Sequence, residues 1–236
     1  MKKNGRGKRF GGTTKIEIVY EDRDLLVADK PAGLLTIDVA GQNKFPTVSS
    51  ILTNYVRKGA ARSTKRLYLV HRLDRDTTGV IIFAKTDKAK NTLKNNWKDV
   101  KKTYYAIVHG RFEKKEGEIS SYLTARANHL MHSVKDAKGG SFALTKYKVL
   151  RESNAYSLLE IDLKTGKRNQ IRVHMMEAGH SIVGDDTYGK RGDRHEKLAL
   201  HAGAIKFKHP FDKRNLSFCT KVPKFFESLL PMPNDR

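Results

Sequence analysis

The stretch LYLVHRLDRDTTGVIIFA, residues 67–84, places a charged turn between two apolar runs. The runs, residues 67–70 and 80–84, are short and bounded by polar residues, as buried strands are. The turn, residues 71–79, holds two carboxylates, two guanidiniums and one imidazole. Loops at strand ends often carry catalytic groups, because the scaffold fixes their positions. The pattern therefore predicts two strands joined by a turn that is a candidate active site.

The same turn has other interpretations. It could be a surface turn held by salt bridges alone. A metal site would use His71 with Asp74 or Asp76, but no third ligand follows at a recognisable spacing. A kinase catalytic loop also contains His-Arg and Asp, yet no glycine-rich loop precedes this turn and no Asp-Phe-Gly follows it. We therefore expect no metal, and the salt-bridged turn stays as the alternative to a catalytic one.

Strand patterns dominate the rest of the chain. Alternating or apolar runs predict strands at residues 15–21, 25–29, 103–109, 117–123, 142–151, 157–163, 199–207 and 216–220. Helical spacing predicts helices at residues 47–57, 87–97, 169–178 and 224–230. Consecutive strands often lack an intervening helix, so we expect an α+β fold with a mixed, mainly antiparallel β-sheet and flanking helices.

Charge and composition limit the class of protein. The 236 residues include 47 Lys and Arg but 25 Asp and Glu, a net charge of +22. A surplus of this size indicates a polyanionic partner, with nucleic acid first and a merely solvated basic face as the alternative. No apolar run is long enough to span a membrane, so we expect no membrane partner. The single cysteine, Cys219, excludes a disulfide framework and a cysteine zinc cluster, which favours the cytoplasm.

The first residues differ from the rest. Residues 1–16 hold six basic residues and no acidic one, and several glycines lie among them. They lack the apolar segment of a secretory signal. We therefore predict a basic, flexible N-terminal arm over residues 1–14 that touches phosphate, followed by one domain over residues 15–236.

Two further clusters contain residues suited to chemistry. Residues 163–175 (LKTGKRNQIRVHM) predict a basic turn and then a helix, with Arg168 and Arg172 on one helical face, an arrangement that suits phosphate or carboxylate. Residues 102–110 (KTYYAIVHG) predict a strand whose two tyrosines point to opposite sides. A solvated basic face and ordinary core packing are the alternatives. Residues 179–190 (GHSIVGDDTYGK) are rich in Gly and Asp without an evident chemistry.

Taken together, these blocks resemble the RluA family of RNA pseudouridine synthases. The resemblance is carried, in chain order, by YEDRDLLVADKPAGLLT, HRLDRDTTGVIIFAK, KTYYAIVHG, TGKRNQIRVHM, GHSIVGDDTYG and LALHAGAIKFKHP, and it covers about residues 15–230. It implies the pseudouridine synthase fold with a central catalytic cleft. The family usually has TGRTHQIRVH where this chain has Lys167, Arg168 and Asn169, which bears on substrate contacts more than on chemistry. Many members carry an N-terminal S4 domain, and this chain is expected to be a catalytic domain without one.

The resemblance implies roles for particular residues. Asp74 is the catalytic carboxylate, Arg172 its guanidinium partner, and Tyr104 the ring that stacks on the target uracil and helps to remove its C5 proton. Arg72 fills the stack that the flipped base vacates, with a phosphate contact as the alternative. The RNA-binding and base-flipping set has four further members. His71 orders the turn, and the RNA backbone is held by Lys102, Lys167 and Arg168.

The implied reaction converts specific uridines in structured RNA to pseudouridine by base flipping, C1′–N1 cleavage and C5–C1′ rejoining, without cofactor or metal. The substrate is ribosomal or transfer RNA, and the enzyme is expected to be a cytoplasmic monomer. The alternative is a non-catalytic RNA-binding or ribosome-associated protein on the same fold. A metal-dependent nuclease is a third hypothesis. The sequence does not identify the RNA, the uridine position or the nucleophilic route.

Overall fold

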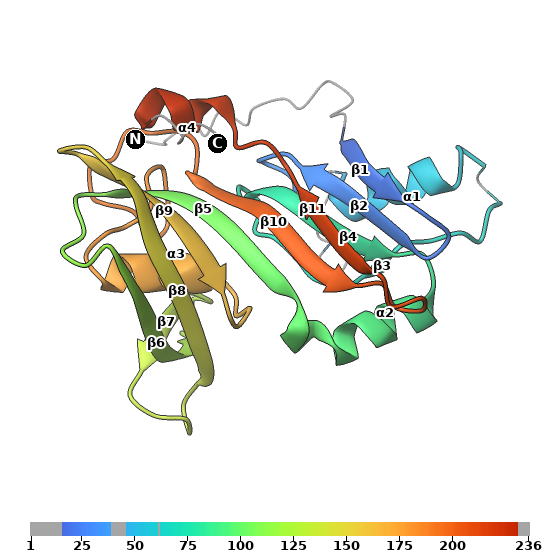
Figure 1. The fold of residues 1–236 in the computed structure, drawn as a ribbon, viewed down its shortest axis with the longest axis horizontal. Coiled ribbons are helices and arrows are strands. Elements are labelled where there is room, and N and C mark those ends of the chain that lie inside the picture. Colours follow the sequence, from blue (N-terminus) through green and yellow to red (C-terminus); the bar gives the residue numbers. More distant parts are fainter. Residues whose placement is uncertain (1–15, 39–45, 61, 231–236) are drawn as a thin grey trace, which may run out of the picture.

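One continuous β-sheet runs through the computed structural model, which describes residues 16–38, 46–60 and 62–230 (Figure 1). Eleven strands are found in these residues, in the order β1-β2-β4-β10-β5-β9-β8-β6-β7, with β3 paired to β4 and β11 to β10. The strands are β1 (Glu17–Glu21), β2 (Leu25–Lys30), β3 (Tyr68–Leu69), β4 (Thr78–Ala84), β5 (Lys101–His109), β6 (Glu116–Ala125), β7 (Met131–Val134), β8 (Ser141–Glu152), β9 (Tyr156–Leu163), β10 (Leu200–Lys208) and β11 (Asn215–Cys219).

The sheet is mixed and mainly antiparallel, as predicted. Only β4 and β10 pair in parallel among the described strands, through Thr78 with His201 and Gly79 with Ala202. Gly79 has a φ of 111°, and a Cβ there would lie 2.2 Å from the Ala202 carbonyl oxygen. No other residue type could adopt this conformation at such a close approach. The turn that carries Asp74 therefore leads into the parallel junction of β4 with β10, in the interior of the sheet.

Each helix follows a recognisable signal. The helices are α1 (Val48–Val56), α2 (Asp87–Asn95), α3 (Gln170–Glu177) and α4 (Lys224–Leu229). Thr86 caps α2 by accepting from the Ala89 N–H, and Gly179 follows α3 with a φ of 83°, a conformation that glycine favours after a helix. The predicted helix at residues 87–97 is too long, because its last turn is a separate 3₁₀ turn, Trp97–Asp99.

The start of α3 also differs from the prediction. Asn169 is the N-cap residue and has a left-handed conformation with a φ of 51°, so Arg168 lies outside the helix. The side chain of Gln170 accepts from the Lys167 N–H and from the Thr165 hydroxyl, which holds the preceding turn in place. The expectation that Arg168 and Arg172 share one helical face is therefore wrong.

One strand, β7, was not predicted. It has four residues, MHSV, which is too short to show alternation on its own. It forms because it pairs with β6 in an antiparallel register.

Helices cover both faces of the sheet. On one face, α1, α3 and α4 pack on the largest apolar cluster through residues such as Leu52, Ile171 and Phe226. On the other face, α2 contributes Ala89 and Leu93 to a second cluster. The loop side of β4, where the turn of residues 71–77 emerges, therefore stands on a sheet that is packed from both sides.

One sequence prediction, the basic arm of residues 1–14, lies outside the described residues. Each helix that the structure describes is too short or too polar to cross a membrane.

Candidate active site

A pocket of about 160 Å³ lies beside the turn of residues 71–79. Most of its walls come from three segments that are distant in sequence: this turn, strand β5, and the residues from Gly166 to Arg172. Trp97, Leu163 and Leu200 complete the lining. All eight residues that the sequence analysis assigned to the site line the pocket: His71, Arg72, Asp74, Lys102, Tyr104, Lys167, Arg168 and Arg172. The tertiary structure thus brings together a set that the sequence distributes over about one hundred positions.

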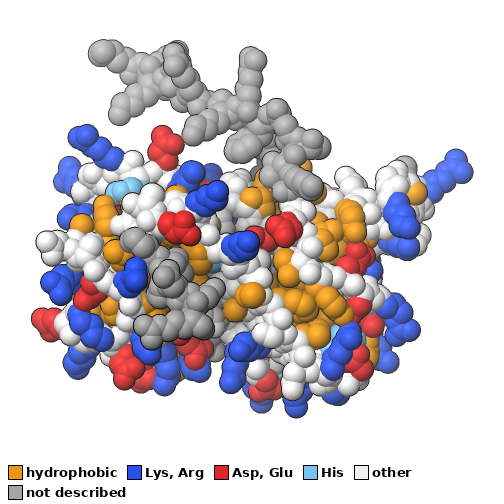
Figure 2. All heavy atoms as spheres, turned by 45° about the horizontal axis from the view of Figure 1, so that its top comes forward, with side chains coloured by type: hydrophobic (Ala, Val, Ile, Leu, Met, Phe, Trp, Pro, Cys, Tyr) orange, Lys and Arg blue, Asp and Glu red, His pale blue; other side chains and the backbone are white. Residues whose placement is uncertain are grey.

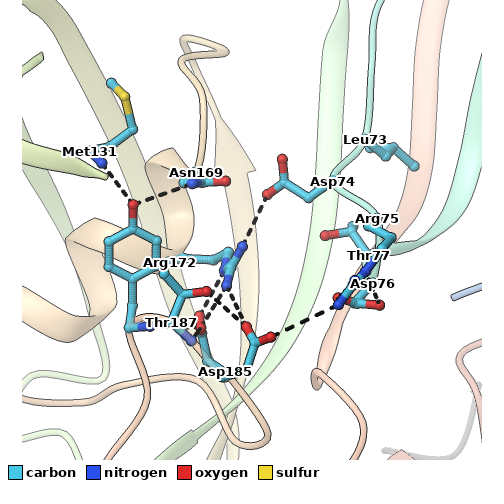
Figure 3. A network of polar contacts seen from close by, with 12 residues as sticks. Leu73, Asp74, Arg75, Asp76, Thr77, Met131, Asn169, Arg172, Asp185 and Thr187 are labelled. Atoms are coloured by element: carbon cyan, nitrogen blue, oxygen red, sulfur yellow. Dashed lines mark hydrogen bonds and ion pairs between the residues drawn. The ribbon is translucent and has the colours of Figure 1, made fainter. Parts of the chain in front are cut away.

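Asp74 lines this pocket, with its side chain 26% exposed. Its Oδ2 is 3.8 Å from Nη1 of Arg172 (Figure 3). Burial raises the pKa of the Asp74 carboxyl above its ordinary value, while the positive charges of Arg172 and Arg72 oppose that rise. The pocket therefore holds a carboxyl group whose hydration is weakened by burial and whose negative charge is favoured by the nearby guanidiniums.

Two buried side chains, Lys30 and Thr36, donate hydrogen bonds to the backbone around Asp74. Lys30 is completely buried, and its Nζ donates to the carbonyls of Pro31, Arg75 and Thr77 at 2.7–2.9 Å. Burial lowers the pKa of Lys30 to about 8. The Thr36 hydroxyl adds a second support, because it donates to the Leu73 carbonyl at 2.8 Å. These contacts fix the turn on the residues both before and after Asp74.

Arg172 is anchored by a carboxylate that the sequence analysis did not assign. Its Nε and Nη2 donate to Asp185 at 2.7 and 2.6 Å, a bidentate pair that is buried on both sides (Figure 3). Asp185 also accepts the N–H groups of Thr187 and Tyr188. Burial opposes the charge of Arg172, but the hydrogen bonds and charge of Asp185, together with the charges of Asp74 and Asp186, raise its pKa above the ordinary value. The pair with Asp185 leaves Nη1 on the side of Asp74.

A signal for Asp185 did exist in the sequence. A guanidinium in a pocket that excludes water needs hydrogen-bond acceptors for its N–H groups, and the carboxylate of Asp74 alone does not supply enough of them. The adjacent Asp185 and Asp186 in the loop of residues 179–190 were the available candidates. Their distance in sequence from Arg172 is short, but only the fold shows that Asp185 points inward while Asp186 has a side chain that is 69% exposed.

Tyr104 and Tyr105 behave as strand alternation predicts. Tyr104 is buried and lines the pocket. Burial, and to a lesser degree the charge of Asp74, raise the pKa of its phenol well above the ordinary value, so the hydroxyl keeps its proton. Tyr105 lies over Gly203 of the neighbouring strand, where a Cβ would come within 2.5 Å of its ring. The prediction that Tyr105 is a packing residue is consistent with this contact.

His71 and Lys102 form an inner wall with Trp97. Nε2 of His71 accepts the N–H of Ile82 at 3.0 Å, and its ring lies 4.9 Å from that of Trp97. Burial lowers the pKa of His71 to about 3, so the imidazole is neutral. The Lys102 ammonium lies 5.6 Å from the centre of the Trp97 ring and is itself buried, which lowers its pKa. The hydrogen bond of His71 thus ties the start of the turn to β4, and Lys102 lies in the lining of the pocket.

The rim of the pocket is basic. Arg72, Lys167 and Arg168 are exposed, and Arg72 makes no hydrogen bond or ion pair with any residue that the structure describes. Elsewhere, Lys and Arg side chains are spread over the face shown in Figure 2, with acidic side chains between them. The positive charge of the protein is therefore distributed widely, and the rim places part of it directly over Asp74.

Comparisons with known proteins agree on one family. A family model described as RNA pseudouridylate synthase matches residues 24–177. The chain is 33% identical over 231 residues to ribosomal large subunit pseudouridine synthase D of Zymomonas mobilis, covering 92% of this chain and 72% of that protein. It is 32% identical over 218 residues to an uncharacterized RNA pseudouridine synthase, YlyB, of Bacillus subtilis, with 91% and 72% covered. The solved structure of human RNA pseudouridylate synthase domain containing 4 superposes with a TM-score of 0.76 at 25% identity, covering 92% of this chain and 95% of that one.

Proposed function

Since the chain belongs to the RluA family of RNA pseudouridine synthases, we propose that Asp74, Tyr104 and Arg172 perform the isomerisation in the pocket described above. The chain is an RNA pseudouridine synthase, an isomerase whose substrate is uridine in RNA. The reaction breaks the bond from C1′ to N1 and forms one from C1′ to C5. The hydrogen on C5 is lost and N1 gains one, so the product has the same composition as the substrate.

The observation that carries the proposal is the position of Asp74. Its carboxylate lies in a pocket, 3.8 Å from a guanidinium that is locked in place by another carboxylate. An ionised carboxylate in such a site can attack the sugar or stabilise positive charge that develops at C1′. Both routes require the anion, and Arg172 favours the anion against the effect of burial.

Tyr104 is assigned the stacking role. Its ring lies in the wall of the same pocket, and a phenol whose pKa is raised is a poor base. We therefore expect its ring to support the uracil while the base turns. The raised pKa argues against a free phenolate at Tyr104. Its participation in removing the C5 proton is therefore a prediction that the pKa does not support.

The target base must leave its helix to reach Asp74. A uracil that is paired and stacked cannot turn, so we propose that it flips into the pocket. Arg72 is the residue that we expect to fill the vacated stack, because its side chain is exposed beside the pocket and makes no hydrogen bond or ion pair with the described residues. Lys167 and Arg168 are expected to hold the adjacent phosphates, and Lys102 a group inside the pocket.

The substrate is structured RNA, with ribosomal RNA favoured by the names of two relatives and transfer RNA as the other candidate. We propose that residues 15–236 form the catalytic domain, that the basic residues 1–14 contact phosphate, and that the protein acts as a monomer in the cytoplasm without a metal. A non-catalytic RNA-binding role is not favoured, because Asp74, Tyr104 and Arg172 are all present in one pocket.

Substitution of Asp74 tests the assignment directly. The C5 hydrogen leaves during the reaction, so RNA carrying tritium at uridine C5 releases label when pseudouridine forms. We expect Asp74→Ala and Asp74→Asn to release none while binding the same RNA as the wild type. Label release by Asp74→Ala at the wild-type rate would remove Asp74 from the mechanism. Pseudouridine mapping of total RNA from cells with and without the gene then identifies the target.

A further inference from the structure

Asn169 lines the pocket and lies between Asp74 and Tyr188 (Figure 3). In the orientation drawn, its amide oxygen faces the Asp74 carboxylate and its nitrogen faces the Tyr188 hydroxyl at 3.3 Å. Two acceptors that face each other repel, whereas amide oxygen and nitrogen occupy equivalent places when the group turns by 180°. The electrostatics therefore favour the turned amide.

The turned amide satisfies every group in the chain of contacts. Nδ2 of Asn169 then donates to Asp74 Oδ2 at 2.9 Å and to Oδ1 at 3.2 Å. Its Oδ1 accepts from the Tyr188 hydroxyl at 3.3 Å. That hydroxyl in turn accepts the N–H of Met131 in β7 at 2.8 Å, so its own hydrogen is free to point at Asn169. The Met131 contact thus sets the direction in which Tyr188 donates, and Tyr188 sets the direction of the amide.

The backbone supports the same arrangement. Asn169 has a φ of 51°, a left-handed conformation that asparagine tolerates better than most residues. This conformation ends the turn before α3 and brings the short side chain to Asp74.

We propose that Asn169 is a positioning residue for Asp74, and that the Tyr188 hydroxyl holds its amide in the orientation that donates to the carboxylate. The inference rests on the proposed role of Asp74 as the catalytic carboxylate. Hydrogen bonds donated to a carboxylate favour its ionised form. Asn169 therefore keeps Asp74 ionised to a lower pH and aims its oxygens, without contacting the reacting atoms itself.

The other charged and titratable groups around Asp74 come from several elements, and the test leaves all of them unchanged. They are Lys30 at the end of β2, Arg72 in the same turn, Tyr104 in β5, Arg168 before α3, and Arg172 in α3 with its partners Asp185 and Asp186. A shift in the pH profile after a change at residue 169 then reports the lost contact.

The test is the pH dependence of kcat for tritium release in three variants. Asn169→Gly removes the side chain and accepts the left-handed backbone without strain. Asn169→Asp keeps the shape but replaces the donor with a second carboxylate. Tyr188→Phe removes only the hydroxyl that orients the amide. We expect the acid limb of the profile to move to higher pH by about one unit in Asn169→Gly, further in Asn169→Asp, and by less in Tyr188→Phe.

His129→Gly is the matched control, because His129 also has a left-handed backbone (φ 63°) but is exposed in a loop away from the pocket. Its profile should match the wild type. An acid limb that stays in place in both Asn169→Gly and Asn169→Asp overturns the proposal, as does a shift in Asn169→Gly larger than that in Asn169→Asp. If Asp74→Ala is inactive while those profiles stay unshifted, only the role of Asn169 fails. If Asp74→Ala is active, the proposed function fails with it.

Discussion

Arg172 gives two of its guanidinium N–H donors to Asp185, at 2.6 and 2.7 Å, and turns its remaining nitrogen toward Asp74 at 3.8 Å. Of its three carboxylate partners, Asp74, Asp185 and Asp186, the closest is therefore Asp185 and not Asp74, the proposed catalytic residue. Asp185 holds the guanidinium still, and Asp74 is left with a weaker contact that a substrate can replace. This division explains how one arginine can be both a buried structural group and part of an active site.

Asp185→Asn should reduce both stability and activity. The substitution leaves the buried Arg172 without its closest counter-charge, and breaking a buried ion pair costs about 3–5 kcal/mol. Urea unfolding measures the free energy, and tritium release measures the activity. Asp186→Asn is the matched control: its carboxylate is largely exposed, so we expect less than about 0.5 kcal/mol. Equal unfolding free energies for the two variants would contradict the assigned role of Asp185.

Arg172→Lys should lose most of the activity although it keeps the charge. A lysine ammonium is a point charge and cannot hold Asp185 through two parallel bonds while also facing Asp74. We expect kcat to fall about 100-fold or more, since a change of 2.7 kcal/mol in the barrier is a factor of about one hundred. Arg75→Lys serves as control, because Arg75 is exposed and pairs with Asp76 beside the same pocket. Near-normal turnover by Arg172→Lys would show that the reaction does not need a planar guanidinium at this position.

Lys30 should give the protein a pH-dependent stability in the alkaline range. Burial lowers its folded pKa to about 8, below the value of about 10.4 in an unfolded chain. Between these values the unfolded chain binds more protons than the folded one, so the unfolding free energy rises with pH. We expect wild type to gain about 2–4 kcal/mol relative to Lys30→Met from pH 8 to 10.4. A constant difference between the two proteins would mean that Lys30 titrates normally.

Lys30→Met should also slow the reaction at neutral pH, because three backbone carbonyls near Asp74 lose their donor. Buried acceptors without a partner cost about 1–3 kcal/mol each, so the turn is expected to shift. The readout is kcat for tritium release at pH 7. Lys85→Met is the comparison: Lys85 also donates to a backbone carbonyl, that of Asp22, but far from the pocket. A kcat equal to that of Lys85→Met would contradict a supporting role for Lys30.

RNA binding should depend steeply on salt, and the rim residues should divide between binding and catalysis. If 6–10 phosphates are contacted, affinity falls about 10³–10⁵-fold between 50 and 200 mM salt. Lys167→Ala should weaken binding and reduce the slope of log K against log salt by about 1. Arg72→Ala should instead lower kcat more than affinity, because its proposed task is to fill the stack after flipping. If Arg72→Ala reduces the salt slope as much as Lys167→Ala does and leaves kcat unchanged, the result favours a phosphate contact for Arg72 over insertion into the stack.

Local patterns were sufficient for most of the elements. Two-residue alternation located the strands, and Thr86 and Gly179 marked helix ends correctly, because these signals depend on neighbouring residues only. Predictions from local patterns were wrong at two places. The left-handed conformation of Asn169 separates Arg168 from α3, and β7 forms through its pairing with β6.

The composition and motifs of the chain determined its family, its basic character and the identity of Asp74, Tyr104 and Arg172 as the site candidates. The tertiary structure decided how those residues are held: Asp185 on Arg172, Lys30 beneath the turn, and Asn169 against Asp74. These contacts join segments that the pairing of β4 with β2 and β10 and the packing of α3 bring together. A sequence period describes which side of an element a residue occupies, whereas the partner of a buried charge is set by which elements pack against each other.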